Sequence, residues 1–429
     1  MSHRNPSKTS EFAPTWYEKT AIQAPVCLDS GSLNDTYDVA IIGAGLAGLS
    51  AALHLAKAGS KVVLIEKFTI GQAASGRNGG FCTTGWACGD EDILKMVGPD
   101  QAQVLNELSE EGLRWMRERA FSKNYASCQP INGCLTLSLF ASEELDISKQ
   151  KLTNFIRGPR YKSGTLDLTA FHFHPLNFLR CLTLDCLAAG VSIQENCEVT
   201  KMRSVVDGKT DLSFGDNQAI KVTAAQIIIT TGGTGGTRFS KLARLILPIQ
   251  TFITVSDPMP EILAHHIPTD YAISDTRRAG NYFRKLPDGR LLWGMGISAL
   301  SAPNHQKINT MATKDIAAHL PELAKDMRCA NIKLAYAWSG TMGYARHFMP
   351  YVGQISKNMF CVTGFGGHGM NTAPIAGKVI AEALSGTSDR LEAFGSIPRQ
   401  ATFGTIGKMA AEIYYQASQM KDAFKERLA

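Results

Sequence analysis

Three glycines near the N-terminus have the spacing of a dinucleotide-binding turn. They belong to the run Gly43, Ala44, Gly45, Leu46, Ala47 and Gly48. In such a turn the first glycine permits a tight bend, the second lets the backbone approach a pyrophosphate, and the third lets a helix pack closely on a strand. The diphosphate then lies at the positive N-terminal end of the following helix. The run therefore predicts a nucleotide-binding turn.

A carboxylate follows this turn at the distance that ribose recognition requires. Glu66 comes about twenty residues later, at the end of an apolar segment. A carboxylate there accepts hydrogen bonds from both ribose hydroxyls and repels a ribose 2′-phosphate, whereas the alternative interpretation is a surface acid at a strand end. FAD and NAD share this motif, so these residues alone leave the choice between the two cofactors open.

A strand, a helix and a second strand are predicted to position the turn and the acid. Residues 38–42 are a short apolar run typical of a strand, residues 49–58 have the apolar spacing of a helix, and residues 61–66 are a second apolar strand. Gly59 ends the helix. This order predicts a βαβ unit.

A second glycine-rich segment follows the acid. It reads Ala74, Ser75, Gly76, Arg77, Asn78, Gly79 and Gly80. It resembles the A-S-G-R-N-G-G loop of the FAD-dependent D-amino-acid oxidase (DAO) superfamily, in particular its γ-glutamylputrescine oxidase-like branch. Small residues let backbone N–H groups line the path of a ribityl chain and a pyrophosphate, and Arg77 and Asn78 supply donors toward a flavin. A flexible Gly/Ser loop is the alternative interpretation.

The resemblance covers nearly the whole chain. Further matching stretches occur in the family order, at residues 15–17, 174–175, 227–232, 281–284, 287–290, 364–369 and 376–377. Together they are specific for the superfamily and point to the branch, but they do not identify a substrate. The resemblance implies that the cofactor is FAD.

The resemblance also implies which further residues contact FAD. Val199 presents its backbone to the adenine, Thr231 and Gly232 pass close to the pyrophosphate, and Lys67 is assigned to the same site. The pyrimidine side of the isoalloxazine is assigned to Gly367, His368, Gly369 and Met370. A glycine turn that opens a helix also directs N–H groups and a partial positive charge at the flavin N1/C2=O edge, where negative charge develops on reduction.

His368 has two interpretations, because it is assigned both to the flavin and to the substrate side. It acts either as a catalytic base or, in the interpretation we prefer, as a packing residue that contributes mainly its backbone. The chain departs from the family pattern at residues 344–350, where relatives often have a turn with threonine or aspartate. Here Arg346 and His347 make the segment basic. The segment either recognises an acidic or aromatic substrate or faces water.

The implied activity is oxidation of the C–N bond of an amine, a γ-glutamylated amine or an amino acid, by hydride transfer to flavin N5. The product is an imine, which hydrolyses. Because the amine must be neutral, we expect an aromatic wall near N5, for which the candidates are Tyr282, Trp293 and Tyr344. Arg284 or Arg346 is expected to hold a carboxylate. The chemistry needs no catalytic base, and O2 or a quinone is the expected electron acceptor.

Two other functions stay open at this point. The same turn serves NAD(P)-linked oxidoreductases, and a flavin-binding protein without activity is a sensor. The sequence has a single dinucleotide motif, which disfavours an enzyme that uses both FAD and NAD(P)H. Bleaching of a bound flavin by an amine distinguishes an enzyme from a sensor.

The length predicts more than one domain. The chain has 429 residues, whereas a single hydrophobic core supports about 250–300. The predicted fold is α/β, with an FAD-binding Rossmann-type (glutathione-reductase-like) domain interleaved with a mainly antiparallel substrate domain. The expected boundaries are an arm at 1–36, an FAD domain at 37–100, 165–245 and 335–429, and a substrate domain at 101–164 and 246–334.

The composition disfavours several other classes of protein. The net charge of +6 is spread along the chain, without the interleaved basic and aromatic residues of a nucleic-acid site. The ten cysteines show no C-x-x-C pair and no metal-ligand spacing, so no metal site is expected. The N-terminus has no apolar region, and the longest apolar stretches are interrupted. These features predict a cytoplasmic protein without a transmembrane segment.

Overall fold

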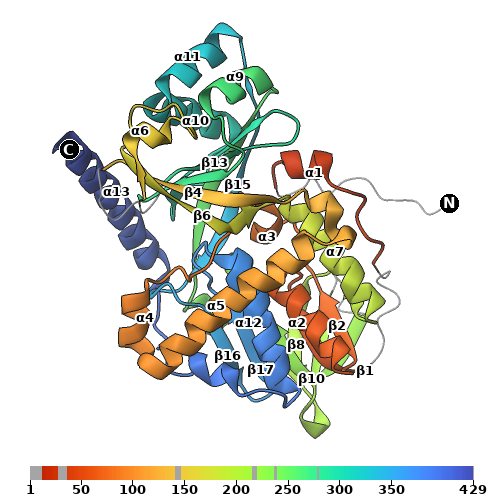
Figure 1. Cartoon of the computed structure of the whole chain (residues 1–429). Coiled ribbons are helices and arrows are strands. Elements are labelled where there is room, and N and C mark those ends of the chain that lie inside the picture. Colours follow the sequence, from red (N-terminus) through yellow and green to blue (C-terminus); the bar gives the residue numbers. More distant parts are fainter. Residues whose placement is uncertain are drawn as a thin grey trace.

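The protein contains two β-sheets, each with its own helices. The computed structural model describes residues 12–27, 36–140, 146–214, 220–235, 239–277 and 280–428. Figure 1 shows one sheet in the lower part of the molecule and the other in the upper part. Among the described residues, no helix combines the length and the apolar character needed to cross a membrane.

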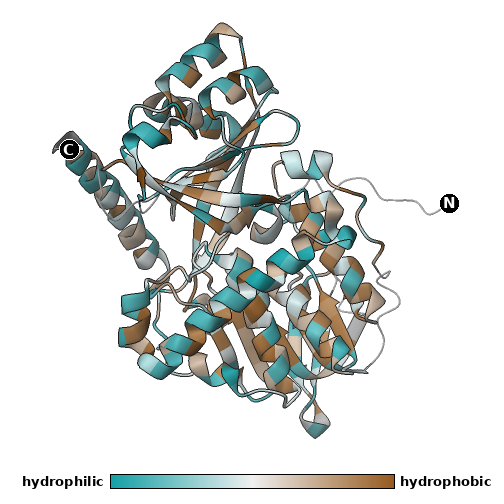
Figure 2. Cartoon of the chain, in the orientation of Figure 1, coloured by the Kyte–Doolittle hydropathy of each residue, from teal (hydrophilic) through white to brown (hydrophobic). Residues whose placement is uncertain are grey.

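The lower sheet has the strand order β16-β17-β10-β1-β2-β7, and β8 and β9 continue from β10. Its strands are β1 (Thr36–Ile42), β2 (Val62–Ile65), β7 (Ser192–Gln194), β8 (Val199–Ser204), β9 (Thr210–Phe214), β10 (Ile220–Ile229), β16 (Tyr351–Ser356) and β17 (Met359–Thr363). The central strands are parallel, with Ile41 paired to Leu64 and Ile228. Parallel strands covered on both faces are apolar throughout, as Figure 2 shows for this sheet.

Helices from distant parts of the chain cover the lower sheet. They are α2 (Leu46–Lys57), α4 (Asp90–Val97), α5 (Pro99–Ala120), α7 (Pro175–Ala188) and α12 (Gly369–Leu384). Helices α2 and α12 cross so closely that a Cβ atom on Gly377 would lie 2.4 Å from the Ala47 carbonyl oxygen. The predicted βαβ unit and the Rossmann-type domain are therefore confirmed.

The upper sheet has the strand order β15-β11-β14-β13-β12-β4-β6-β3, with β5 beside β6. Its strands are β3 (Phe81–Cys82), β4 (Ile131–Ser138), β5 (Ile147–Ser148), β6 (Ser163–His172), β11 (Leu247–Ser256), β12 (Ala272–Asp275), β13 (Tyr282–Lys285), β14 (Leu291–Ser298) and β15 (Leu334–Tyr344). All described pairs are antiparallel except β4 with β12. The prediction of a mainly antiparallel second domain is confirmed.

The helices of the upper part are mostly short. They are α6 (Lys149–Leu152), α9 (Pro260–His266), α10 (His305–His319) and α11 (Pro321–Cys329), and α8 (Ser240–Ala243) precedes β11. Residues of α9, α10 and α11 share a buried apolar cluster with the strands of the upper sheet. One face of this sheet is therefore covered, which leaves its other face toward the lower domain.

The expected domain boundaries need correction for five elements. Helix α5 was expected in the substrate domain, but it packs with α2 and α12 in the apolar cluster of the lower sheet. Strands β3 and β15 and all of β6 except its first two residues were expected in the FAD domain, but they hydrogen-bond into the upper sheet. The last helix, α13 (Gly404–Leu428), packs on β11 and β14 rather than on the lower sheet. Sequence proximity does not determine which of two neighbouring sheets a segment joins.

Candidate active site

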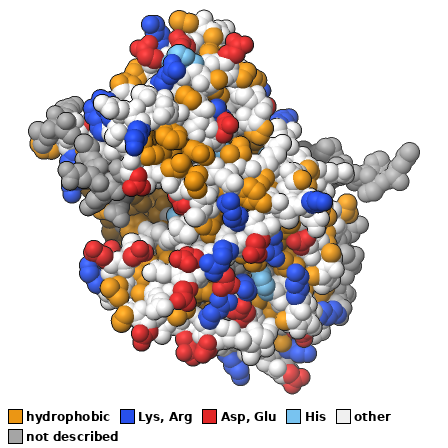
Figure 3. Space-filling model, viewed as in Figure 1, with side chains coloured by type: hydrophobic (Ala, Val, Ile, Leu, Met, Phe, Trp, Pro, Cys, Tyr) orange, Lys and Arg blue, Asp and Glu red, His pale blue; other side chains and the backbone are white. Residues whose placement is uncertain are grey.

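A cavity of about 640 Å³ lies between the two sheets. Its lower wall contains Gly45, Leu46 and Ala47, and its upper wall contains strands β11, β13, β14 and β15. A smaller cavity of about 120 Å³ shares Gly45 and Ser75 with it and continues toward Glu66. The larger volume falls within the ~300–1,000 Å³ range of small-molecule sites. Figure 3 shows a recess between the two parts of the molecule, floored by hydrophobic side chains.

The turn between β1 and α2 depends on glycine at two positions. Gly43 has a φ of +109°, and its N–H donates to the Ile65 carbonyl at 2.8 Å. A Cβ atom on Gly48 would lie 2.0 Å from the Gly43 carbonyl oxygen. Gly45 is the N-cap of α2, has no side chain to cap the helix, and lines both cavities. The Leu46 N–H donates to Ser75 Oγ at 3.2 Å, and the other N–H groups of the first turn provide a site for an anion.

Glu66 lies at the end of β2, at the wall of the smaller cavity. Its Oε2 accepts a hydrogen bond from the Ala44 N–H at 2.7 Å, and its Oε1 accepts one from the Phe68 N–H at 2.9 Å. Burial raises the pKa of this carboxyl above its usual value. Each carboxylate oxygen has two acceptor positions, so both can also accept a ribose hydroxyl.

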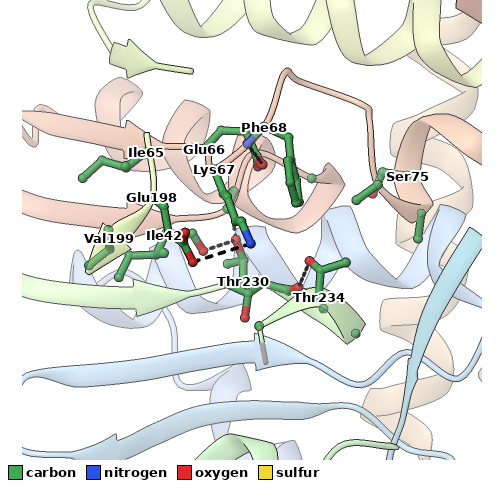
Figure 4. A pocket seen from close by; sticks show the side chains of 18 of the residues that line it. Ile42, Ile65, Glu66, Lys67, Phe68, Ser75, Glu198, Val199, Thr230 and Thr234 are labelled. Carbon is green, nitrogen blue, oxygen red and sulfur yellow. Dashed lines mark hydrogen bonds and ion pairs between the residues drawn. The ribbon is translucent and has the colours of Figure 1, made fainter. Parts of the chain in front are cut away.

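The rim of the same cavity carries an ion pair. Figure 4 shows Lys67 pointing across to Glu198, and their Nζ and Oε1 atoms lie 3.5 Å apart. Val199, Thr231 and Gly232 also line this cavity. The structure thus brings together the residues that the sequence assigned to the adenine, ribose and pyrophosphate.

The glycine-rich segment after β2 forms the short helix α3 (Ala74–Arg77) and continues as a loop through residues 78–80. The Asn78 side chain holds the loop itself, because it donates to the Ser75 carbonyl at 2.8 Å and accepts from the Gly80 N–H at 2.8 Å. Arg77 is buried, and burial lowers its pKa to about 10 although Glu18 opposes this shift. Its Nη2 donates to the Ala13 carbonyl at 2.7 Å. Arg77 and Asn78 therefore line the cavity, and their hydrogen bonds to the protein also fix the position of its wall.

The glycine turn after β17 leads into α12. Gly364, Gly366 and Gly367 all have positive φ values. His368 is the N-cap of α12, and no side chain caps this helix end. Gly369 and Met370 begin the helix at the cavity wall. Two helix N-termini, those of α2 and α12, whose N-cap residues make no side-chain capping bond, therefore open on one cavity, which favours an anionic ligand such as FAD with its developing flavin charge.

The His368 side chain forms hydrogen bonds with the segment at residues 83–84. Its Nε2 lies 2.9 Å from the Thr84 carbonyl oxygen and 3.3 Å from Thr83 Oγ1. Donation to the carbonyl requires a proton on Nε2, and burial lowers the pKa of the ring, so the neutral form is favoured. These contacts favour the packing interpretation of His368.

Four of the proposed cofactor residues do not line either cavity. Ala44, Gly48, Gly76 and Gly80 lie behind the wall. A Cβ atom on Gly76 would lie 2.1 Å from the Gly71 carbonyl oxygen, and one on Gly80 would lie 2.2 Å from the Phe173 carbonyl oxygen. Their contribution is to the shape of the backbone rather than to contact with a ligand.

Two of the three aromatic candidates line the larger cavity. Tyr282 and Tyr344 are both half-buried in its wall. The Tyr282 hydroxyl lies 3.4 Å from Thr251 Oγ1, and burial raises the pKa of Tyr282 to about 12. Its ring fits between two glycines, since a Cβ atom would lie 2.8 Å from the ring if placed on Gly79 and 2.0 Å if placed on Gly294.

Trp293 was wrongly placed in this wall. It pairs with Phe283 across β13 and β14, and the two rings stack with centroids 4.4 Å apart. Its Nε1 donates to Asp315 of α10 at 2.8 Å. Side chains alternate along a strand, so Tyr282 faces the cavity while Phe283 and its partner Trp293 face the helices on the other side.

Arg284 was also wrongly placed as a carboxylate anchor. It is buried, and its donors are used by the protein: Nε bonds the Gly79 carbonyl at 2.8 Å and Nη2 bonds the Phe173 carbonyl at 2.9 Å. Nη1 lies 3.2 Å from Nδ1 of His172, whose pKa is lowered to about 3 by burial and by Arg284 itself. The neutral ring of His172 therefore accepts. Arg284 connects the glycine-rich loop to β6.

Arg346 does not reach the cavity either. Its side chain is exposed, and its guanidinium carbon lies 5.9 Å from the centre of the Phe403 ring. Of the two interpretations left open for this residue, the structure favours the one in which it faces water. His347 lies 3.0 Å from the Pro398 carbonyl and thus holds the segment that leads to α13.

Sequence reasoning missed several residues of the cavity wall. They are Phe81, Thr83, Trp86, Thr251, Ser274, Ile297, Met342, Phe348 and Tyr415. Most lie on strands or loops without a motif. Tyr415 lies on α13 and is buried, and only its helical spacing from Ala411 marks the inner face of that helix. No local pattern connects this helix with the cavity.

Replacing Arg284 by methionine is expected to destabilise the protein rather than to weaken substrate binding selectively. Buried acceptors left without a donor cost about 1–3 kcal/mol each, so the free energy of unfolding should fall by more than about 2 kcal/mol. Thermal unfolding measures this change. The matched control Arg346→Met should leave the unfolding midpoint unchanged. An unchanged midpoint with a raised KM in Arg284→Met would instead show that Arg284 binds the substrate.

Comparisons with known proteins agree with this site. Residues 38–383 match the DAO family, which is described as FAD dependent oxidoreductase. The chain is 29% identical to a probable oxidoreductase, OrdL, of Haemophilus influenzae over 90% of this chain and 92% of that protein. It is 28% identical to the gamma-glutamylputrescine oxidoreductase of Escherichia coli over 91% and 93% of the two chains. Glycine oxidase from Geobacillus kaustophilus has a similar fold, with a TM-score of 0.65 at 17% identity over 85% and 99% of the two chains.

The family match runs from β1 to α12 and so includes all the elements that form the described cofactor site. FAD fits the observed cradle, because the N-terminal ends of α2 and α12 provide for its pyrophosphate and flavin, and Glu66 provides for its ribose. This chain belongs to the DAO family of FAD-dependent oxidoreductases.

Proposed function

We propose that this enzyme oxidises the C–N bond of an amine whose reacting carbon carries no carboxylate. The observation behind this proposal is the charge of the larger cavity. Among the described residues that line it, Arg77 is the only one with a permanently charged side chain. Its Nε and Nη2 donate to the Ser339 and Ala13 carbonyls. Its Nη1 makes no hydrogen bond within the described residues, but this atom is buried rather than exposed to the cavity, and it lies 3.9 Å from Glu18. A carboxylate beside the reacting carbon would therefore lack a dedicated partner.

The wall suits a neutral amine. Apolar side chains, including Phe81, Ile297 and Met342, surround the space beside Tyr282 and Tyr344. An apolar wall lowers the pKa of a bound amine and so favours the form with a free lone pair. Bound FAD supplies the acceptor for the hydride that leaves the carbon next to nitrogen. Because the amine arrives neutral, no side chain has to remove a proton first, and His368 keeps its bond to Thr84.

One of the relatives supports the same class of substrate. The name of the Escherichia coli relative is gamma-glutamylputrescine oxidoreductase. A γ-glutamylated diamine carries its carboxylate on the glutamyl part, at the end opposite to the free amine of the diamine part, which agrees with a cavity that has no carboxylate anchor. The imine product hydrolyses to an aldehyde and ammonia.

We also propose that the reaction takes place in the cytoplasm, with O2 or a quinone as the electron acceptor. All ten cysteines are free thiols in the structure, which agrees with a reducing compartment. Formation of hydrogen peroxide in the absence of added quinone identifies O2 as the acceptor.

A panel of amines tests the substrate class. A diamine and its γ-glutamylated derivative are compared with glycine and L-proline at the same pH, and aldehyde, ammonia and keto-acid products are measured. We expect kcat/KM for the amines to exceed that for the amino acids by at least about tenfold, which corresponds to 1.4 kcal/mol. Preferred turnover of the amino acids would contradict the proposal.

The pH dependence of kcat/KM provides a second test. We expect kcat/KM to rise with pH as the substrate amine loses its proton, toward an amine pKa of about 10.4 for an alkylamine such as lysine. Replacing His368 by alanine should leave the position of this rise unchanged, because the neutral ring does not titrate there. A shift of the rise in His368→Ala would assign the titrating group to the histidine instead.

A further inference from the structure

Helix α13 (Gly404–Leu428) lies along the outer edge of the molecule in Figure 1, and one of its faces is fastened to the upper sheet. Glu412 accepts hydrogen bonds from Ser298 Oγ and the Ala299 N–H, both at 2.9 Å. Glu426 accepts from Arg160 Nη2 at 2.6 Å. Tyr415 packs between these contacts in an apolar cluster with β11 and lines the active-site cavity. This inner face holds the helix in place along most of its length.

The opposite face of α13 is apolar and exposed. Ile406 is 73% exposed, Ile413 65%, Met420 73% and Phe424 64%. Ala410 and Ala417 lie between them on the same side and are also exposed. Single exposed apolar residues are ordinary, but a continuous exposed row on one helix indicates a contact surface.

The spacing along this row indicates another helix as the partner. The six apolar residues are Ile406, Ala410, Ile413, Ala417, Met420 and Phe424. They follow one another at intervals of four, three, four, three and four residues, which is the 3.5-residue repeat of a coiled-coil seam. A helix that lies on a membrane has instead a broad apolar face bordered by lysine and arginine. Here the row is bordered by Gly407, Tyr414 and Lys421 on one side and by Met409, Gln416 and Ala423 on the other, so one lysine stands where a membrane helix would have a basic border.

We propose that α13 pairs in antiparallel orientation with α13 of a second copy of this chain. A twofold axis that passes the outer face of α13 at the level of residue 415 places Ile413 opposite Ala417 of the other copy and Ala410 opposite its Met420. Each alanine of the seam therefore faces a larger side chain, so the two surfaces interdigitate. Ile406 lies opposite Phe424 at each end. Such self-complementarity is the property that a twofold interface requires.

The sizes of the seam residues favour this orientation over a parallel pair. In a parallel pair each alanine would face an alanine and leave a gap. In the antiparallel pair, Lys421 lies beside Gly407 of the other copy and meets no like charge. The two helices lie side by side in opposite directions, so the positive end of each helix dipole lies beside the negative end of the other, which is favourable.

The mass of the FAD-loaded protein in solution tests the proposal. We expect sedimentation equilibrium to give twice the chain mass of 46.5 kDa for the unmodified chain. Ile413→Glu should give a single chain with its FAD content unchanged. The matched control is Leu184→Glu, on α7, where a single leucine outside this row is 50% exposed. That variant should remain a dimer.

An exchange of side chains tests the register. Ile413→Ala leaves a gap and Ala417→Ile overfills the seam, so each is expected to raise the dissociation constant of the dimer at least about tenfold. The double variant Ile413→Ala/Ala417→Ile restores the same facing pair and should restore the dimer. This result is independent of whether the glutamate variant folds.

Three outcomes would overturn the proposal. They are an unmodified chain that sediments as one copy, a dimer that survives Ile413→Glu, and an exchanged double variant that stays dissociated. Vesicles of phosphatidylcholine and phosphatidylserine serve as the probe for a membrane. Cosedimentation of a monomeric chain with them, lost in Ile413→Glu, would assign the surface to lipid instead.

Discussion

Replacing Gly45 by leucine is expected to yield folded but colourless protein. Gly45 lines both cavities at the point where they meet, and it caps α2 with its backbone alone. A Cβ atom there would already lie 3.1 Å from Ser75 Oγ, and the rest of a leucine side chain would occupy the path of the pyrophosphate. The ratio of flavin absorbance to protein absorbance should therefore fall from stoichiometric to a small fraction.

The control for this experiment is Gly89→Leu. Gly89 is also a helix N-cap, at the start of α4, but its φ of −71° suits any residue and no atom lies within 4 Å of an added Cβ. That variant should keep its FAD. A fully yellow Gly45→Leu protein would show that the pyrophosphate does not pass this turn.

Replacing Gly294 by alanine is expected to reduce kcat/KM strongly while FAD stays bound. Gly294 lies opposite Tyr282 on the neighbouring strand, and an added Cβ would lie 2.0 Å from the tyrosine ring. The ring has to move from its place in the cavity wall. A displacement of about 1 Å near a reacting centre costs about 100-fold, so we expect a loss of that order in anaerobic flavin reduction by an amine.

A double variant shows whether the tyrosine carries this effect. In a Tyr282→Ala background the added methyl group no longer meets a ring, so Gly294→Ala should change kcat/KM little further. Such non-additivity is the signature of two groups in direct contact. Equal losses in both backgrounds would show that alanine disturbs β14 itself rather than Tyr282.

The parts of the fold that were predictable are those encoded within short stretches of chain. The turn at Gly43 to Gly48, the strand before it and the acid after it all belong to one βαβ unit, so their spacing determines their placement. The turn before α12 was predictable for the same reason, since glycines with positive φ lead directly into a helix. Local patterns of this kind do not depend on the rest of the molecule.

The substrate side was less predictable because it depends on strand register. Tyr282 and Trp293 both lie in aromatic strand segments, and only the pairing of Phe283 with Trp293 shows that Trp293 faces away from the cavity. Arg284 shares its strand with Tyr282, but its donors are used by carbonyl groups more than a hundred residues away. A one-residue change of register exchanges the two faces of a strand. Contacts of this range leave no local pattern.

The most direct test of the account is anaerobic reduction of the bound flavin by an amine. The purified FAD-loaded protein is mixed without oxygen with a primary amine, with a γ-glutamylated diamine or with NADH, and the flavin absorbance is followed over time. We expect a competent amine to bleach the flavin stoichiometrically and to yield the aldehyde, and NADH to leave the spectrum unchanged. Rapid stoichiometric bleaching by NADH, together with no bleaching by any amine, would contradict it.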